Sequence, residues 1–198
     1  AVFFLARILG ALYFINNINE DDLVRRCRRA LWGNTALFLV FFLAFVIRTL
    51  VADGYAVRPE TGEVFMEPYK YLMNFLQMPV VLFVFLIGVV AVLWGIIRTL
   101  WKPTFDKGIW FAGAGTVLAV LALLLVAGYN NTAYYPSTHD LQSSLTLANS
   151  CSSQFTLKVM AYVSILVPFV LAYIFYAWRS IDNRKIDAKE MGEGGHAY

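Results

Sequence analysis

Four apolar runs of about 20 residues constrain this chain more than any other feature. They lie at residues 35–52, 78–97, 109–128 and 159–178, and Arg48 is their only charged residue. Each run matches the ~20 residues that a helix needs to cross a bilayer core about 30 Å thick. The runs lack the polar face of a soluble helix. Because backbone groups in lipid must hydrogen-bond within their own segment, we expect four transmembrane helices.

The composition agrees with this prediction. Hydrophobic residues make up 60% of the chain and charged residues 15%, whereas soluble domains contain about 45–50% and about 25%. A soluble enzyme is therefore excluded as a class. The net charge of +3 reflects the Lys and Arg of the connecting loops and gives no indication of a nucleic-acid partner.

A fifth apolar stretch, residues 1–16, is too short to span a bilayer. It lacks the basic flank and the small-residue cleavage site of a signal peptide. We interpret it as the second half of a transmembrane helix whose first half precedes the sequence. The predicted fold is therefore an all-α integral membrane protein, a transmembrane helix bundle with four full spans plus one truncated N-terminal span.

Basic residues predict the topology, because cytoplasmic loops carry an excess of Lys and Arg. Eleven of the 16 Lys and Arg residues fall on alternate connections. Tryptophans cluster near the predicted inner ends of the helices and several tyrosines near the outer ends, as in an interfacial aromatic belt. We expect one transmembrane domain, with spans at residues 1–16 (partial), 33–53, 77–99, 108–129 and 156–179, outer loops at 54–76 and 130–155, inner loops at 17–32 and 100–107, and a cytoplasmic tail at 180–198.

Small residues recur on single faces of two predicted helices. Such stripes let helix backbones approach closely in lipid, so we expect these two helices to pack within one bundle. Pro168 lies within the last span and is expected to kink it. The stripes are Gly88, Ala91 and Gly95 on one helix, and Gly115, Ala119 and Ala122 on the next.

Arg7 is the one candidate functional residue. If its helix ends near Asn16, nine residues at about 1.5 Å each place Arg7 roughly 13–14 Å from the inner surface. An intramembrane arginine indicates a functional site that faces a partner, a cavity or a counter-charge. A structural hydrogen-bond anchor between helices is an equal alternative.

The predicted spans contain no recognisable catalytic centre. A haem needs an axial ligand such as His, Met or Cys, but His139 falls in an outer loop and His196 in the polar tail. The methionines near the outer helix ends are more typical of packing than of ligation. The predicted topology separates Cys27 from Cys151, and the chain has no metal-ligand spacing, phosphate-binding loop or nucleophile motif. We therefore predict no catalytic residue and no metal site.

Short motifs in the last third of the chain resemble subunit II of the cytochrome bd-type quinol oxidases. A Ser-Leu-Thr-Leu-Ala-Asn-Ser run at 144–150 is followed by Ser152-Ser153, by Thr-Leu-Lys-Val-Met at 156–160 and by Val167-Pro168. Gly-Ala-Leu-Tyr at 10–13 and Asp-Gly-Tyr at 53–55 fit the ends of two earlier helices of that family. Their order and spacing extend the resemblance over essentially the whole chain, as the C-terminal half of the subunit.

The resemblance implies a haem-free structural subunit of a terminal oxidase that couples quinol oxidation to the reduction of oxygen to water. Subunit I of such a complex carries haems b and d and the quinol site, and subunit II packs against it. The expected partners are therefore subunit I, the quinol pool and the lipid bilayer of the bacterial cytoplasmic membrane. The resemblance transfers no catalytic residue to this chain and leaves a structural quinone open.

Two other classes of function remain as alternatives. A segment of a transporter or channel would explain Arg7 and the Pro168 kink, but the sequence has no internal repeat or pair of broken helices. A small stand-alone membrane protein of the interaction type is the second alternative.

Overall fold

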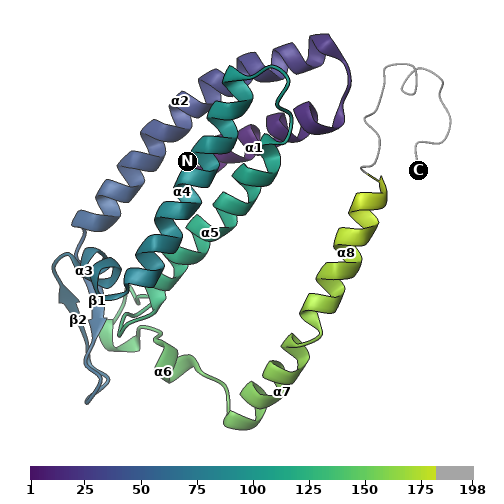
Figure 1. The fold of residues 1–198 in the computed structure, drawn as a ribbon. Helices are drawn as coiled ribbons and strands as arrows, with labels where there is room; N and C mark the ends of the chain where they lie inside the picture. Colours follow the sequence, from purple (N-terminus) through teal and green to yellow (C-terminus); the bar gives the residue numbers. More distant parts are fainter. Residues whose placement is uncertain (182–198) are drawn as a thin grey trace.

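Four helices long and apolar enough to cross a membrane form the framework of this computed structural model, which describes residues 1–181 (Figure 1). A shorter apolar helix precedes them, so the predicted all-α membrane bundle is confirmed. The predicted tail beyond residue 181, with His196, lies outside the described residues. The helices are α1 (Val2–Asn17), α2 (Asp21–Val51), α4 (Pro79–Trp101), α5 (Gly108–Gly128), and the successive α7 (Gln154–Ser164) and α8 (Val167–Ile181), which together form the fourth span.

The two ends of the bundle differ in chemistry. At one end, here called the basic end, α1 connects to α2 and α4 connects to α5. The arginines at 25, 26, 28 and 29 and Lys102 and Lys107 lie there. The opposite end, here called the hairpin end, carries a small antiparallel sheet of β1 (Gly54–Val57) and β2 (Val64–Glu67) and the short helix α3 (Lys70–Gln77).

Helix α2 begins much earlier than the span expected from residue 33. It starts at Asp21, so most of the inner loop predicted at 17–32 is helical. Asp21 and Asp22 lie in the first turn, where carboxylates interact favourably with the helix dipole. The prediction considered only the apolar run and therefore missed the polar turns that extend the helix beyond the membrane.

The hairpin end is more ordered than the two outer loops that were predicted there. Strand β1 pairs with β2 from Gly54 opposite Glu67 to Val57 opposite Val64. The side-chain amide of Gln142 extends this sheet, because it both donates to the Val64 carbonyl and accepts from its N–H, at 2.9 Å each. The second loop contains a 3-10 turn, Leu141–Ser143, and a one-turn helix α6, Leu147–Ser150.

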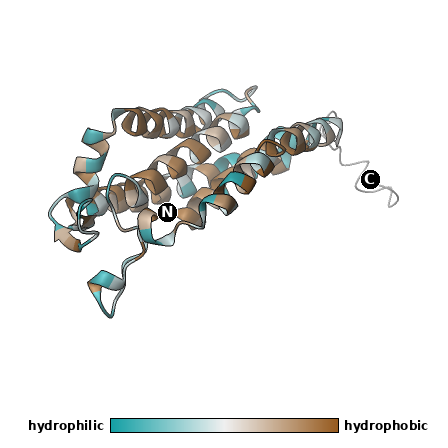
Figure 2. Ribbon diagram, turned by 90° about the horizontal axis from the view of Figure 1, so that it is seen from below, coloured by the Kyte–Doolittle hydropathy of each residue, from teal (hydrophilic) through white to brown (hydrophobic). Residues whose placement is uncertain are grey.

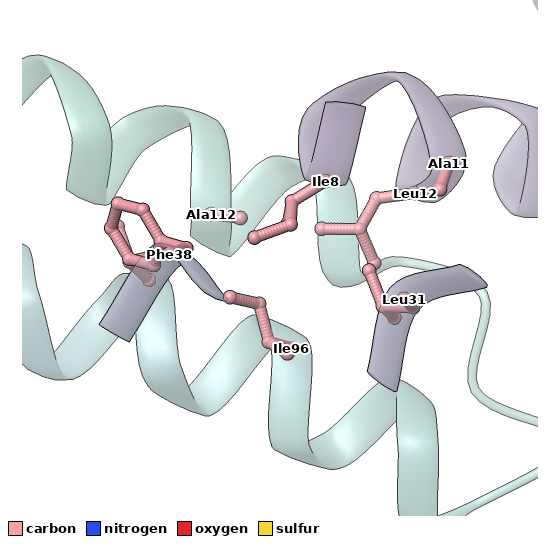
Figure 3. Close-up of a cluster of buried hydrophobic side chains, with 8 residues drawn as sticks. Ile8, Ala11, Leu12, Leu31, Phe38, Ile96 and Ala112 are labelled. Atoms are coloured by element: carbon pink, nitrogen blue, oxygen red, sulfur yellow. The ribbon is translucent and has the colours of Figure 1, made fainter. Parts of the chain in front are cut away.

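The principal core lies where α1, α2, α4 and α5 meet near the basic end. Ile8 and Leu12 of α1, Leu31 of α2 and Ile96 of α4 are fully buried in it, and their side chains converge in Figure 3. A second cluster near the hairpin end joins α3 to α4 and α5. Helix α1 is thus held to the rest of the bundle by the buried apolar side chains on one of its faces.

Helices α4 and α5 touch through their backbones. A Cβ added at Gly88 would lie 2.6 Å from the Ala119 nitrogen, and one at Gly115 would lie 2.5 Å from the Gly88 carbonyl oxygen. Gly95 lies equally close to the Gly108 carbonyl of α5. The predicted small-residue stripes therefore form one continuous helix–helix contact, as expected for packing in lipid.

The last span breaks where Pro168 predicts it. Helix α7 ends at Ser164 and α8 begins at Val167, because proline lacks the N–H that would continue the helical ladder. All side chains described in α7 and α8 are exposed except that of Ala177, which is half-buried. The two helices stand beside the bundle in Figure 1, although they are largely apolar (Figure 2).

A pair of glycines on α5 tests the backbone contact. Gly115→Ala in the full-length protein should destabilise the bundle by about 1–3 kcal/mol, because the new methyl group overlaps the Gly88 carbonyl. Gly113→Ala is the matched control, since nothing lies within 4 Å of its Cβ position. It should stabilise the helix by up to about 1 kcal/mol. SDS-induced unfolding in detergent measures both changes, and equal effects would contradict the contact.

Candidate functional site: an intramembrane arginine and uncovered helix faces

Arg7 lies on a face of α1 that the described chain leaves uncovered. Its side chain is exposed, and its guanidinium lies 5.7 Å from the centroid of the Phe3 ring. Neighbouring Ile8 and Leu12 point the other way, into the core (Figure 3). The structure therefore does not place Arg7 in a hydrogen-bonded contact between described helices, which was one of the two roles considered for it.

No carboxylate of residues 1–181 lies in the apolar part of a spanning helix. The acidic side chains of this part of the chain lie in loops, in the hairpin or at the N-terminal end of α2, at positions 20, 21, 22, 53, 60, 63, 67, 106 and 140. The counter-charge expected for Arg7 is therefore not supplied by the described helices.

Arg28 connects α2 to the end of α4 and was not identified from the sequence. Its guanidinium donates to the carbonyls of Thr99 and Pro103, the second at 2.7 Å, and more distantly to those of Lys102 and Phe105. The last carbonyls of a helix have no partner within the helix. Arg28 thus provides hydrogen-bond donors for the unpaired carbonyls at the C-terminal end of α4. The same contacts hold the turn between α4 and α5 in place.

A buried amide connects the elements of the hairpin end. Asn74 of α3 is fully buried and donates to the Val126 carbonyl and to Thr132 Oγ1 at 2.9 and 2.8 Å. It accepts from Asn130 Nδ2 at 3.1 Å, and Asn130 in turn donates to Gln77 at 2.6 Å. This network holds α3 against the end of α5, which makes it structural.

The motif at 144–150 also has a structural role. Ser144 is fully buried and accepts from the Ser137 N–H at 3.0 Å. Thr146 and Asn149 form a reciprocal capping box around α6, and Ser153 caps the start of α7. Side chains that cap helices in this way satisfy otherwise unpaired N–H groups, so the motif orders the loop that leads into the last span.

A shallow crevice of about 380 Å³ at the hairpin end separates α2 from α5. Arg48, Thr49 and Tyr71 line its polar side. Burial raises the pKa of the Tyr71 phenol, and the nearby Tyr55 phenol raises it further. Tyr71 therefore stays protonated at neutral pH and can only act there as a neutral hydrogen-bonding group.

The candidate ligand residues do not converge. No group of three or more His, Cys, Asp or Glu side chains among residues 1–181 could hold a metal ion. His139 is exposed in the loop after α5, and Met73 and Met160 are exposed as well. Cys27 and Cys151 are both free thiols.

Two apolar hollows mark surfaces that the described helices leave uncovered. One, of about 440 Å³, lies between the start of α1 and helices α2, α4 and α5, and Thr116 is its only polar residue. The other, of about 510 Å³, separates α8 from α1 and α5. Tyr13 and Trp110 line it on one side, and Phe175 and Trp178 on the other.

Comparison with known proteins identifies relatives of this chain. Residues 1–181 match the family model described as cytochrome bd terminal oxidase subunit II. The cytochrome bd-I ubiquinol oxidase subunit 2 proteins of Escherichia coli strains K12, O6:H1 and O157:H7 are each 32% identical over 142 residues.

The chain belongs to the cytochrome bd terminal oxidase subunit II family.

The alignment covers 71% of the chain but 36% of each E. coli relative, so the chain spans well under two thirds of the length of the relatives it matches. The predicted family membership is confirmed. Homology and the apolar helices also support a multi-pass protein of the inner membrane.

Arg28 provides a test of how the subunit II bundle is held at its basic end. Arg28→Gln in full-length subunit II should lower the free energy of unfolding in detergent by about 1.5–3 kcal/mol, the range for hydrogen bonds to a charged group. Arg29→Gln is the matched control, because Arg29 is exposed on the same turn of α2. An equal, small effect of the two substitutions would contradict the assigned role.

Proposed function

We propose that this chain is part of the haem-free subunit of a complex that oxidises quinol and reduces oxygen to water. Haems b and d then belong to subunit I, as membership of this family implies. In this proposal the chain contributes structure and not a catalytic group. It folds as a helix bundle in the bacterial cytoplasmic membrane and packs against subunit I.

The uncovered outer face of α7 and α8 is the observation that carries this proposal. Tyr162, Phe169 and Tyr176 repeat at intervals of seven residues, and Leu166 and Tyr173 lie between them on the same side. All five side chains are 60% or more exposed. Hydrophobic residues at such spacing form the seam along which two helices pack. We name these five residues the outer stripe.

Tyrosines in the outer stripe favour a protein partner over lipid. Tyr162 is the ninth residue of the 27-residue span from Gln154 to Ser180, more than two turns from its end, and is 72% exposed. A phenol in hydrocarbon without a hydrogen-bond partner is unfavourable, and buried tyrosine hydroxyls normally find one. A neighbouring subunit would supply such a partner along with apolar surface.

The basic end of the bundle faces the cytoplasm in this proposal. Its arginines and lysines follow the excess expected for cytoplasmic loops. Exposed tryptophans lie towards the same end of the helices, at positions 32, 94, 101, 110 and 178. The C-terminus that follows α8 is therefore placed on the cytoplasmic side, and the hairpin end faces outward.

Co-purification of full-length subunit II with subunit I tests the proposed function. The protein extracted in mild detergent should bring down a haem-bearing partner, show a reduced-minus-oxidised haem spectrum and oxidise quinol. A colourless preparation without a partner would contradict the proposal.

Variants of the outer stripe locate the contact. Phe169→Ala combined with Tyr173→Ala should reduce the haem recovered per subunit II several-fold, because truncating residues at the centre of an interface costs most of its binding energy. Val117→Ala combined with Leu124→Ala, on the equally exposed face of α5, is the matched control and should leave the haem content unchanged.

A further inference from the structure

The side chain of Arg7 points towards the N-terminal end of α1 and away from the basic end of the bundle. Helix α1 runs towards the basic end, and helical side chains lean towards the N-terminus of their own helix. The guanidinium lies over the ring of Phe3, four residues earlier, which confirms this direction. A long basic side chain that snorkels would run to the nearer surface instead.

The packing of α1 against α5 sets the depth of Arg7. A Cβ at Gly108, the first residue of α5, would lie 3.1 Å from Cδ2 of Leu12, so Leu12 is level with the inner edge of that span. Arg7 is five residues further from the basic end, about 7–8 Å along the helix. Because its side chain continues towards Phe3, the charge lies deeper than the Cα atom.

An unpaired guanidinium at this depth is costly. Charged side chains inside a bilayer are almost always paired or face a polar cavity. A phospholipid phosphate lies at the surface from which this side chain points away, and the apolar parts of the described spans carry no carboxylate. The contact with the Phe3 ring contributes only about 0.5–2 kcal/mol. The charge therefore needs a partner that the described spans do not supply, and an acidic side chain on another helix would provide one.

The surface beside Arg7 is shaped for close approach by a helix. Gly10, one turn along α1, has nothing within 4 Å of its Cβ position, and Ala6 next to Arg7 is exposed. Small residues at such intervals let a second helix approach the backbone closely. Phe3 and Phe14 are both exposed and lie on either side of the small residues Ala6 and Gly10 along α1. Their rings would pack against the sides of a second helix.

We propose that a transmembrane helix from the rest of the subunit II polypeptide packs on this face and pairs an Asp or Glu carboxylate with Arg7. Neighbouring segments of one polypeptide usually pack side by side. The relatives are far longer than this chain, which spans 36% of their length. The contact thus joins this bundle to the remainder of its own subunit, whereas the outer stripe faces subunit I.

Photo-crosslinking in full-length subunit II tests this contact. Phe3 is replaced by p-benzoylphenylalanine, which keeps an aromatic ring beside Arg7, and membranes holding the assembled complex are irradiated. The crosslinked peptide should join α1 to another transmembrane segment of subunit II that carries Asp or Glu within one turn of the linked residue. Crosslinks to lipid alone, to subunit I, or to a segment without a carboxylate would overturn the proposal.

Arginine variants separate the ion pair from simple packing. In the crosslinking background, Arg7→Gln should abolish or shift the crosslink, and Arg7→Lys should restore most of it. Arg98→Gln is the matched control, because the Arg98 guanidinium also lies 5.7 Å from an aromatic ring four residues earlier but belongs to the last turn of α4. An unchanged crosslink in Arg7→Gln would overturn the ion pair, even if subunit II still co-purified with its haem-bearing partner.

Discussion

The backbone contact between α4 and α5 is the interaction on which the rest of the structure depends. Gly88, Gly95 and Gly115 bring the two helices together without intervening side chains. Ile96 of α4 and Ala112 of α5 then form part of the buried surface against which α1 and α2 pack. In a bilayer, lipid tails are as apolar as leucine, so close packing of small residues replaces the hydrophobic effect as the reason for association.

Polar groups then fix the two ends of this pair. Arg28 satisfies the carbonyls that end α4 at the basic end, and Asn74 binds the Val126 carbonyl near the end of α5 at the hairpin end. Both side chains act where a spanning helix leaves its internal hydrogen bonds unfinished. The apolar spans therefore depend on a few polar residues for their register.

The sequence predicted the spans, the small-residue contact and the Pro168 break, because each follows from local composition or spacing. It did not predict that Arg28 binds the end of α4, because the carbonyl acceptors lie more than 70 residues away in the chain. It also did not predict the hairpin, because each strand is only four residues long. Arg7 was found by its position in an apolar run. Its direction and its open surroundings depend on how α1 packs, which no spacing rule provides.

We infer that the outer stripe of α7 and α8 is an interface with subunit I and does not face lipid. Nitroxide labels at positions 169, 173 and 176, read by their relaxation with membrane-dissolved oxygen, test it most directly in full-length subunit II. We expect low oxygen accessibility in the complex and a several-fold rise when subunit II is prepared without subunit I. Equally high accessibility in both preparations would show that α8 faces lipid and would contradict the claim.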